Sequence, residues 1–274
     1  MKFVVSSSEL LSHLQAISRV INVKNTLPIL DDFLFNLNKN ELEITASDLE
    51  STLITRMKLD NAEGSGLIAV PARILLDTLK EFGTQPLTFD INTDTLAVTI
   101  ISENGKYNAV GQNGIDFPVL PSLKKEKKKS FIVSSGLLFD GISKAIFATA
   151  EDELRPVMGG ILIESSPEKI TFVASDAHKL VRYQRTDGKA DEEGSFILPK
   201  KPASLLKNIL PKEEGPVAVE FDDKNVFFTL AGYKAVCRLI EGNYPNYNSV
   251  IPRNNPRKVT VDRAGFSNIL KRVS

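Results

Sequence analysis

The chain has 274 residues, more than one hydrophobic core usually supports, and its 42% hydrophobic and 25% charged residues are the proportions of a folded protein. Its 34 basic and 34 acidic residues cancel, which argues against a protein that coats nucleic acid through excess positive charge. No apolar run is long enough to span a membrane and no apolar segment follows Met1, so we expect a soluble cytoplasmic protein without a membrane partner.

The chain repeats itself at an offset of 128 residues. Four stretches recur at this spacing: FVVSS at 3–7 with FIVSS at 131–135, Pro28 with Pro156, ASD at 46–48 with ASD at 174–176, and Pro71 with Pro199. A period this long is far above the roughly 20 to 50 residues of solenoid repeats. We therefore predict two copies of one globular domain.

Each copy is expected to run strand, helix, several strands, helix, several strands. Apolar residues spaced by four and three predict helices over 8–20 and 135–150, and a proline opens each of the helices predicted over 71–82 and 199–210. Alternating stretches such as LEITA at 42–46, separated by short polar turns, predict antiparallel strands. The predicted fold is α+β, with two helices packed on antiparallel sheets in each copy.

A third copy begins near the end of the sequence. The stretch VTVDR at 259–263 predicts a strand followed by a helix whose apolar face contains Phe266, Leu270 and Val273. The expected domains are 1–123, 130–250 and the start of a third at 257–274, most of which is missing. The run KKEKKK at 124–129 is interpreted as an exposed connector.

Residue patterns of known catalytic chemistry are absent. The sequence has no GxxxxGK[ST] phosphate-binding loop, and neither His13 nor His178 has metal-ligand spacing to cysteine or carboxylates. Asp48 and Asp176 each follow a strand and a serine, which is typical of turn-forming aspartates. Cys237 alternates with apolar residues and is predicted to be a buried hydrophobe in a strand. We therefore expect neither an enzyme nor a cofactor or metal.

Six stretches spread along the chain carry a resemblance to a known family. They are MKF at 1–3, TLPIL at 26–30, ASDLE at 46–50, VPAR at 70–73, ASDAHKL at 174–180 and GNYPNY at 242–247. Together they resemble the bacterial beta sliding clamp, the beta subunit of DNA polymerase III. The resemblance implies three similar domains per chain and, at full length, a homodimeric ring around duplex DNA. It also implies a processivity factor whose partners are the polymerase catalytic subunit, the clamp loader and other proteins with clamp-binding motifs.

By position, the resemblance assigns DNA contacts to Lys24, Arg73, Lys200 and Lys201. A sliding ring needs only weak, exchangeable phosphate contacts. Each of these residues taken alone also fits a solvated surface charge, but the recurrence of basic residues after Pro71 and Pro199 favours DNA contact by the group. Glu151 and Asp152 stand where relatives often have polar or basic residues, which puts DNA contact by that loop in doubt.

The resemblance also implies a groove for partner peptides in the second copy, with apolar walls and a polar rim. Two of its positions depart from the family pattern, since Ala177 replaces a common glycine and Ser249 a common arginine. The implied groove residues are Arg155, Met158, Ser175, Ala177, His178, Lys179, Leu180, Pro245, Ser249 and Val250.

Two other functions remain open on sequence alone. One is a non-replicative interaction scaffold with the same duplicated fold, which would not be retained on circular DNA. The other is a hydrolase using Asp48 and Asp176, which would lose activity when these aspartates are changed.

Overall fold

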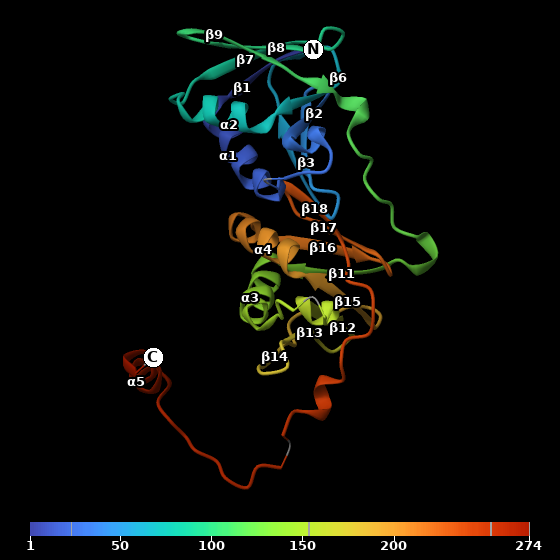
Figure 1. Ribbon diagram of the computed structural model, residues 1–274, viewed down its shortest axis with the longest axis vertical. Coiled ribbons are helices and arrows are strands. Elements are labelled where there is room, and N and C mark those ends of the chain that lie inside the picture. The colour runs from blue at the N-terminus through green and yellow to red at the C-terminus, as the bar shows by residue number, and fades with distance from the viewer. Residues whose placement is uncertain (23, 153, 253, 274) are drawn as a thin grey trace. The chain divides into compact units, whose positions relative to one another are not determined.

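The computed structural model describes residues 1–22, 24–152, 154–252 and 254–273. The chain divides into two compact units, Met1–Tyr244 and Pro245–Ser274 (Figure 1). The first unit contains both copies of the repeat. The described residues of the second contain a 3-10 turn and one α-helix, and each unit is described by itself.

The described residues of the first copy form two α-helices and ten strands. In chain order they are β1 (Lys2–Ser6), α1 (Ser7–Ile17), β2 (Asp32–Asn38), β3 (Glu41–Ser47), β4 (Ser51–Lys58), β5 (Ala62–Glu63), β6 (Gly66–Pro71), α2 (Ala72–Lys80), β7 (Pro86–Asn92), β8 (Ala97–Ser102), β9 (Gly105–Val110) and β10 (Gln112–Asn113).

Two α-helices and eight strands are formed by the described residues of the second copy. They are β11 (Lys129–Ser134), α3 (Ser135–Ala145), β12 (Gly160–Ser165), β13 (Ile170–Ser175), β14 (Leu180–Arg185), β15 (Gly194–Pro199), α4 (Lys200–Ile209), β16 (Pro216–Phe221), β17 (Asn225–Thr229) and β18 (Tyr233–Arg238).

The strand pairing confirms the predicted duplication. The order β6-β2-β3-β4 in the first copy recurs as β15-β12-β13-β14, and β1-β7-β8-β9 recurs as β11-β16-β17-β18. All these pairs are antiparallel. The bounds of α1 and α3 also differ by the 128-residue offset. The α+β fold class predicted from the sequence is therefore correct.

One strand pair joins the two copies. Strand β4 pairs with β18 from Ser51↔Cys237 to Thr55↔Tyr233, so strands of both copies form one nine-stranded sheet. Cys237 is buried in this junction, and burial raises the pKa of its thiol. The prediction of Cys237 as a buried residue in a strand is confirmed.

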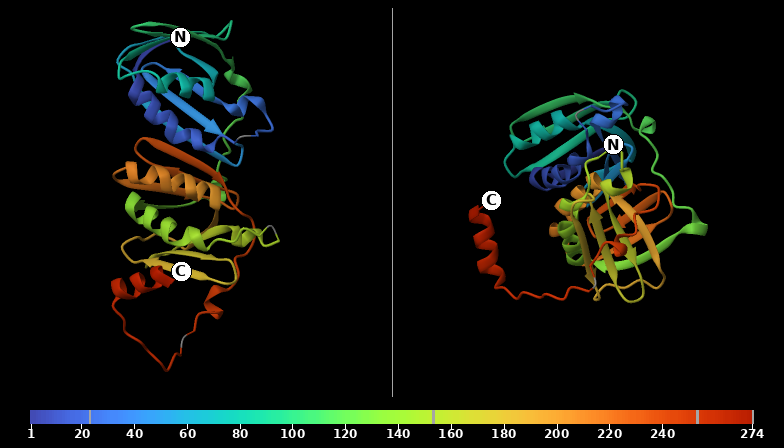
Figure 2. Two further views of the ribbon diagram at one scale, coloured as in Figure 1. Left: turned by 60° about the vertical axis from the view of Figure 1, so that its left-hand side comes forward. Right: turned by 60° about the horizontal axis from the view of Figure 1, so that its bottom comes forward.

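The helices bury the faces that the sequence predicts. Leu10, Leu14 and Ile17 of α1 are buried, as are their counterparts Leu138, Ile142 and Ala145 of α3. The four helices lie along one side of the first unit in Figure 1, and Figure 2 shows them from two further directions. Aromatic rings fill the space beneath them, and the Phe3 and Phe89 rings stack with centroids 4.9 Å apart. The sheets and helices of each copy thus enclose an apolar core.

The helix ends depart slightly from the predicted bounds. Helix α1 ends at Ile17 and continues as the 3-10 turn η1 (Ser18–Val20), and α3 continues likewise as η5 (Ile146–Ala148). Pro71 and Pro199 occupy the N-cap positions of α2 and α4, one residue before the helix. A proline there needs no amide donor, since the first N–H groups of a helix have no partner within it.

The second unit confirms one expectation and corrects another. Helix α5 (Arg263–Val273) forms where the third copy predicts it, with Phe266, Leu270 and Val273 exposed. The strand predicted at 259–261 is not formed. A strand needs a hydrogen-bonded neighbour, as β1 has β7 and β11 has β16, and no described strand pairs with 259–261.

Candidate functional sites

The repeated ASD motif forms the same turn in both copies. In the first, Asp48 Oδ1 accepts the backbone N–H groups of Glu50 and Ser51 at 3.0 and 2.7 Å. In the second, Asp176 Oδ1 accepts those of His178 and Lys179 at 3.0 and 2.8 Å. The predicted role of both aspartates as turn formers is confirmed.

The residue after each aspartate has a left-handed backbone. Leu49 has a φ of 76° and Ala177 a φ of 75°, a region that side-chain-bearing residues seldom adopt. This geometry explains physically why glycine suits position 177. The serines stabilise the turns, since Ser47 Oγ accepts the Leu49 N–H and Ser175 Oγ accepts the Ala177 N–H.

All four predicted DNA contacts lie on exposed or half-buried surface, and they differ in the partners of their side chains. Lys24 lies in the loop after η1 and Arg73 in the first turn of α2, and both are exposed. Lys200 begins α4 and its Nζ donates to Glu151 Oε1 at 2.6 Å, which lowers the pKa of Glu151. Because the Glu151 side chain is 83% exposed, solvent weakens this pair and phosphate can replace the carboxylate.

Lys201 has a different environment. Its Nζ donates to Asn22 Oδ1 at 2.5 Å and to the Val20 carbonyl at 3.1 Å, and it forms an ion pair with Asp48. An ammonium group has three N–H donors, so none is left for a phosphate while these contacts hold. All three partners belong to the first copy. Sequence reasoning missed this contact because no local pattern joins Lys201 to Asp48.

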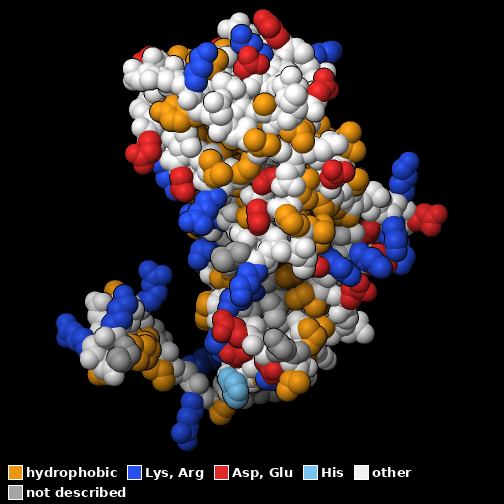
Figure 3. Space-filling model, turned by 45° about the horizontal axis from the view of Figure 1, so that its top comes forward, with side chains coloured by type: hydrophobic (Ala, Val, Ile, Leu, Met, Phe, Trp, Pro, Cys, Tyr) orange, Lys and Arg blue, Asp and Glu red, His pale blue; other side chains and the backbone are white. Residues whose placement is uncertain are grey.

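The acidic loop before Pro156 binds the predicted rim residue Arg155. Asp152 accepts the Leu154 N–H and the Arg155 Nε–H, both at 2.9 Å, and these bonds lower the pKa of Asp152. Glu153, the third residue of this acidic run, lies outside the described residues. On the face shown in Figure 3, Lys and Arg side chains are interspersed with Asp and Glu.

The predicted groove residues of the first unit come from two segments. Arg155 and Met158 belong to the turn η6 (Pro156–Gly159) and its N-cap, and Met158 is buried. The others run from Ser175 at the end of β13 to Leu180 at the start of β14, where His178 and Lys179 are exposed and Leu180 is half-buried. Lys179 forms an ion pair with Asp176, whose pKa is lowered mainly by that contact.

Tyr244 is a neighbour of this turn that sequence reasoning did not single out. Its hydroxyl is buried close to the Ser175 backbone, and burial raises the pKa of Tyr244. The GNYPNY stretch at 242–247 was the available signal, since it contains this tyrosine.

The remaining groove residues, Pro245, Ser249 and Val250, belong to the second unit. Ser249 ends the turn η8 (Tyr247–Ser249), and its hydroxyl donates to the Asn246 carbonyl at 2.7 Å. All three are exposed, with Val250 at 68%.

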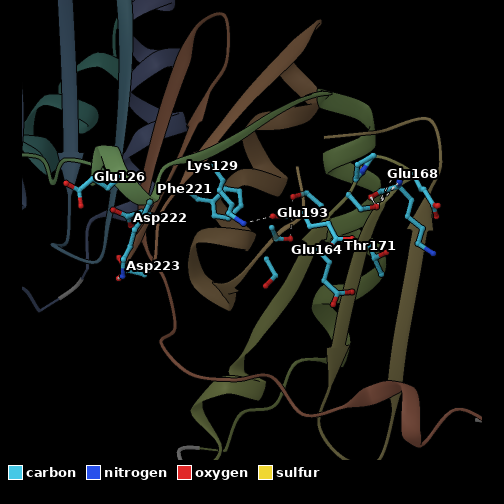
Figure 4. A pocket seen from close by; sticks show the side chains of 16 residues that line it. Glu126, Lys129, Glu164, Glu168, Thr171, Glu193, Phe221, Asp222 and Asp223 are labelled. Carbon is cyan, nitrogen blue, oxygen red and sulfur yellow. Dashed lines mark hydrogen bonds and ion pairs between the residues drawn. The ribbon is translucent and has the colours of Figure 1, made fainter. Parts of the chain in front are cut away.

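An open cavity of about 1130 Å³ lies elsewhere in the second copy (Figure 4). Charged residues dominate its lining and several interact with each other: Lys127 Nζ lies 2.9 Å from Asp223 Oδ2, and Lys129 Nζ donates to the Glu193 carbonyl at 2.5 Å. None of the predicted site residues lines it. Small-molecule pockets are mostly apolar, so this cavity does not resemble one.

In the described part of the chain, no helix has both the length and the apolar character needed to cross a membrane.

Comparisons with known proteins agree over nearly the whole chain. The pattern of the DNA polymerase III beta subunit N-terminal domain matches residues 1–121, and that of its central domain matches residues 133–246. The beta sliding clamp of Synechocystis sp. is 30% identical over 295 aligned positions, covering 100% of this chain and 75% of that protein.

Solved structures show the same fold. The DnaN sliding clamp (DNA polymerase III subunit beta) from Pseudomonas aeruginosa bound to griselimycin has a TM-score of 0.92 at 24% identity, over 99% of this chain and 73% of that one. The DnaN sliding clamp from Bartonella birtlesii, also bound to griselimycin, has a TM-score of 0.89 at 27% identity over the same shares. Because both domain patterns match and the Synechocystis relative aligns with the whole of this chain, the chain belongs to the DNA polymerase III beta subunit family, the bacterial beta sliding clamps.

Proposed function

We propose that this protein is a DNA sliding clamp that acts in the cytoplasm and makes DNA polymerase III processive by encircling duplex DNA. The observation that carries the proposal is the sheet shared by two copies of one fold, with all four helices on one side of the unit (Figure 1). We propose clamp domains at 1–123 and 130–250 and the start of a third at 257–274. The clamp loader and the polymerase catalytic subunit are its proposed partners.

The strand edges support a closed ring. The junction pairs the outer strand β4 of the first copy with β18, which corresponds to β9. Among the described strands, β14 is the counterpart of β4 and is the outermost strand of its sheet. Strand β9 is the counterpart of β18 and is likewise outermost in its sheet. A head-to-tail interface of this kind, used repeatedly, closes a ring when its rotation allows. Retention of the full-length protein on circular but not on linear DNA would test the ring.

Alanine at Lys24, Arg73 and Lys200 is expected to weaken duplex binding regardless of sequence. Each lost phosphate contact should reduce the slope of log affinity against log salt by about 0.9. The measurement is fluorescence anisotropy of a labelled duplex over a salt series. Lys189→Ala, an exposed lysine in the loop between β14 and β15, is the matched control and should leave the slope unchanged. An unaltered slope in the triple variant would assign the three residues to solvated surface.

We propose that the second copy binds partner peptides through the groove residues of the first unit, with Met158 and Leu180 as apolar walls. The assignment of Pro245, Ser249 and Val250 to the same groove stays a prediction from the sequence. Leu180→Ala is expected to weaken binding of a clamp-binding-motif peptide about tenfold, because a half-buried leucine contributes roughly 1.5 kcal/mol of apolar contact. Leu49→Ala, an exposed leucine in the equivalent turn of the first copy, is the control. Equal affinity of both variants and the parent would exclude Leu180 from the groove.

A further inference from the structure

The ion pair between Lys201 and Asp48 crosses the junction of the two copies. Lys201 lies in the first turn of α4, whereas Asp48 lies in the turn between β3 and β4 of the first copy. The same ammonium donates to Asn22 and to the Val20 carbonyl at the end of η1. One side chain of the second copy thus ties together two segments of the first.

Asp48 and Asp176 have the same turn contacts but different charge partners. Asp176 is neutralised within its own turn by Lys179, whereas the position equivalent to Lys179 in the first copy is Ser51, which carries no charge. The Asp48 side chain is only 3% exposed, compared with 20% for Asp176. A buried carboxylate needs a partner, and Lys201 is the cation that the structure pairs with it.

This contact lies at one end of the strand pair that joins the copies. The Arg238 N–H donates to the Glu50 carbonyl at 2.8 Å beside the Ser51↔Cys237 end. At the other end, Thr55 Oγ1 donates to the Gly232 carbonyl at 3.2 Å. The strands of the two copies meet in the nine-stranded sheet at this one strand pair, so the two halves of the sheet can bend about it. A contact from α4, outside the sheet, opposes this bending.

We infer that Lys201 is a positioning residue that fixes the angle between the two clamp copies, and that Lys200 beside it is the residue available to DNA. The two adjacent lysines thus have separate tasks. The role of Lys201 rests on contacts within the protein alone, whereas the assignment of Lys200 to DNA rests on the proposed function.

The test is a double-mutant cycle with Lys201→Met and Asp48→Asn. Methionine keeps the unbranched apolar part of the lysine side chain without its charge, and asparagine keeps the Oδ1 acceptor of the turn without the charge. Each single variant is expected to lower the urea midpoint of unfolding. The double variant should be at least as stable as the less stable of the two single variants, because the second substitution removes a charge that has already lost its partner. Additive losses would show that the two side chains do not act together and would overturn the inference.

Hydrogen exchange locates the effect. In Lys201→Met, amides of residues 50–55 and 233–238 should exchange at least tenfold faster, while those of β7 and β8 should not change. Lys207→Met, an exposed lysine of the same helix, is the control. Uniformly faster exchange would indicate general destabilisation and would contradict a role at the junction. Lys201→Arg should restore slow exchange, since a guanidinium can reach the same acceptors.

A salt series separates positioning from phosphate contact. Lys201→Met should leave the salt slope of duplex binding unchanged, and Lys200→Met should flatten it by about 0.9. A slope lowered by Lys201→Met, with junction exchange unchanged, would make Lys201 a phosphate ligand and overturn the inference. If neither variant changes the slope while the exchange result holds, the proposed DNA contacts fail and the junction role stands.

Discussion

Gly141→Ala is expected to destabilise the protein by about 3 kcal/mol, the upper end of the cost of overpacking a core. A Cβ at Gly141 would lie 2.3 Å from two ring atoms of Phe172 on β13, closer than any real carbon contact. The Phe172 ring is fully buried and packs against the α3 face, so neither it nor the helix has free space to move into. Urea unfolding followed by far-UV circular dichroism measures the loss.

Gly136→Ala in the same helix is the matched control. A Cβ at Gly136 meets no atom within 4 Å, so the added methyl group should stabilise the helix by about 0.4–1 kcal/mol through the lower entropy of the unfolded chain. The two changes are chemically identical, and only the space around them differs. Equal stability of the two variants would show that α3 does not approach β13 as closely as the structure has it.

The local features of this fold could be predicted from the sequence. The 128-residue repeat, the buried faces of α1 and α3 and the turn role of Asp48 all depend on residues within a few positions of each other, or on comparison of the chain with itself. Helix α5 also forms from local signals, because its hydrogen bonds connect residues four apart. The strand expected at 259–261 needs a distant partner, and this prediction was wrong.

The contacts between distant residues could not be predicted in this way. Lys201 and Asp48 are separated by 153 positions, and no periodicity or spacing connects them. The basic residues that follow Pro71 and Pro199 therefore looked equivalent in the sequence. In the structure Arg73 is exposed, whereas Lys201 forms an ion pair with Asp48 of the first copy. The pairing of β4 with β18, which places this lysine beside its carboxylate, was likewise visible only in the structure.

Asp32→Asn is expected to stabilise the protein at pH 7.5 and to have little effect at pH 4. Asp32 begins β2, is 3% exposed, and accepts one hydrogen bond from Gln112 Nε2 at 2.8 Å. Burial raises the pKa of Asp32 from 3.8 to about 6, against the opposing effect of that bond, and the nearby Asp31 raises it further. The folded state therefore binds the proton more tightly than the unfolded state does.

The sign of the pH dependence follows from this difference. The contribution of Asp32 to stability is fully present below pH 3.8, is lost as the pH rises to about 6, and stays lost at higher pH. A displacement of about two pH units corresponds to a loss of at most roughly 3 kcal/mol. Asparagine cannot ionise and keeps an oxygen acceptor for Gln112, so the variant avoids the loss.

The measurement is the free energy of unfolding in urea at pH 7.5 and pH 4 for the parent, Asp32→Asn and the control Asp31→Asn. The exposed Asp31 precedes Asp32 directly, so its substitution removes the same charge from nearly the same place. A gain in Asp32→Asn that disappears at pH 4, with no such change in Asp31→Asn, would attribute the pH dependence to the buried carboxylate. Equal gains in both variants would instead indicate repulsion between the two neighbouring carboxylates, because either substitution relieves it, and burial of Asp32 would then not be the dominant cause.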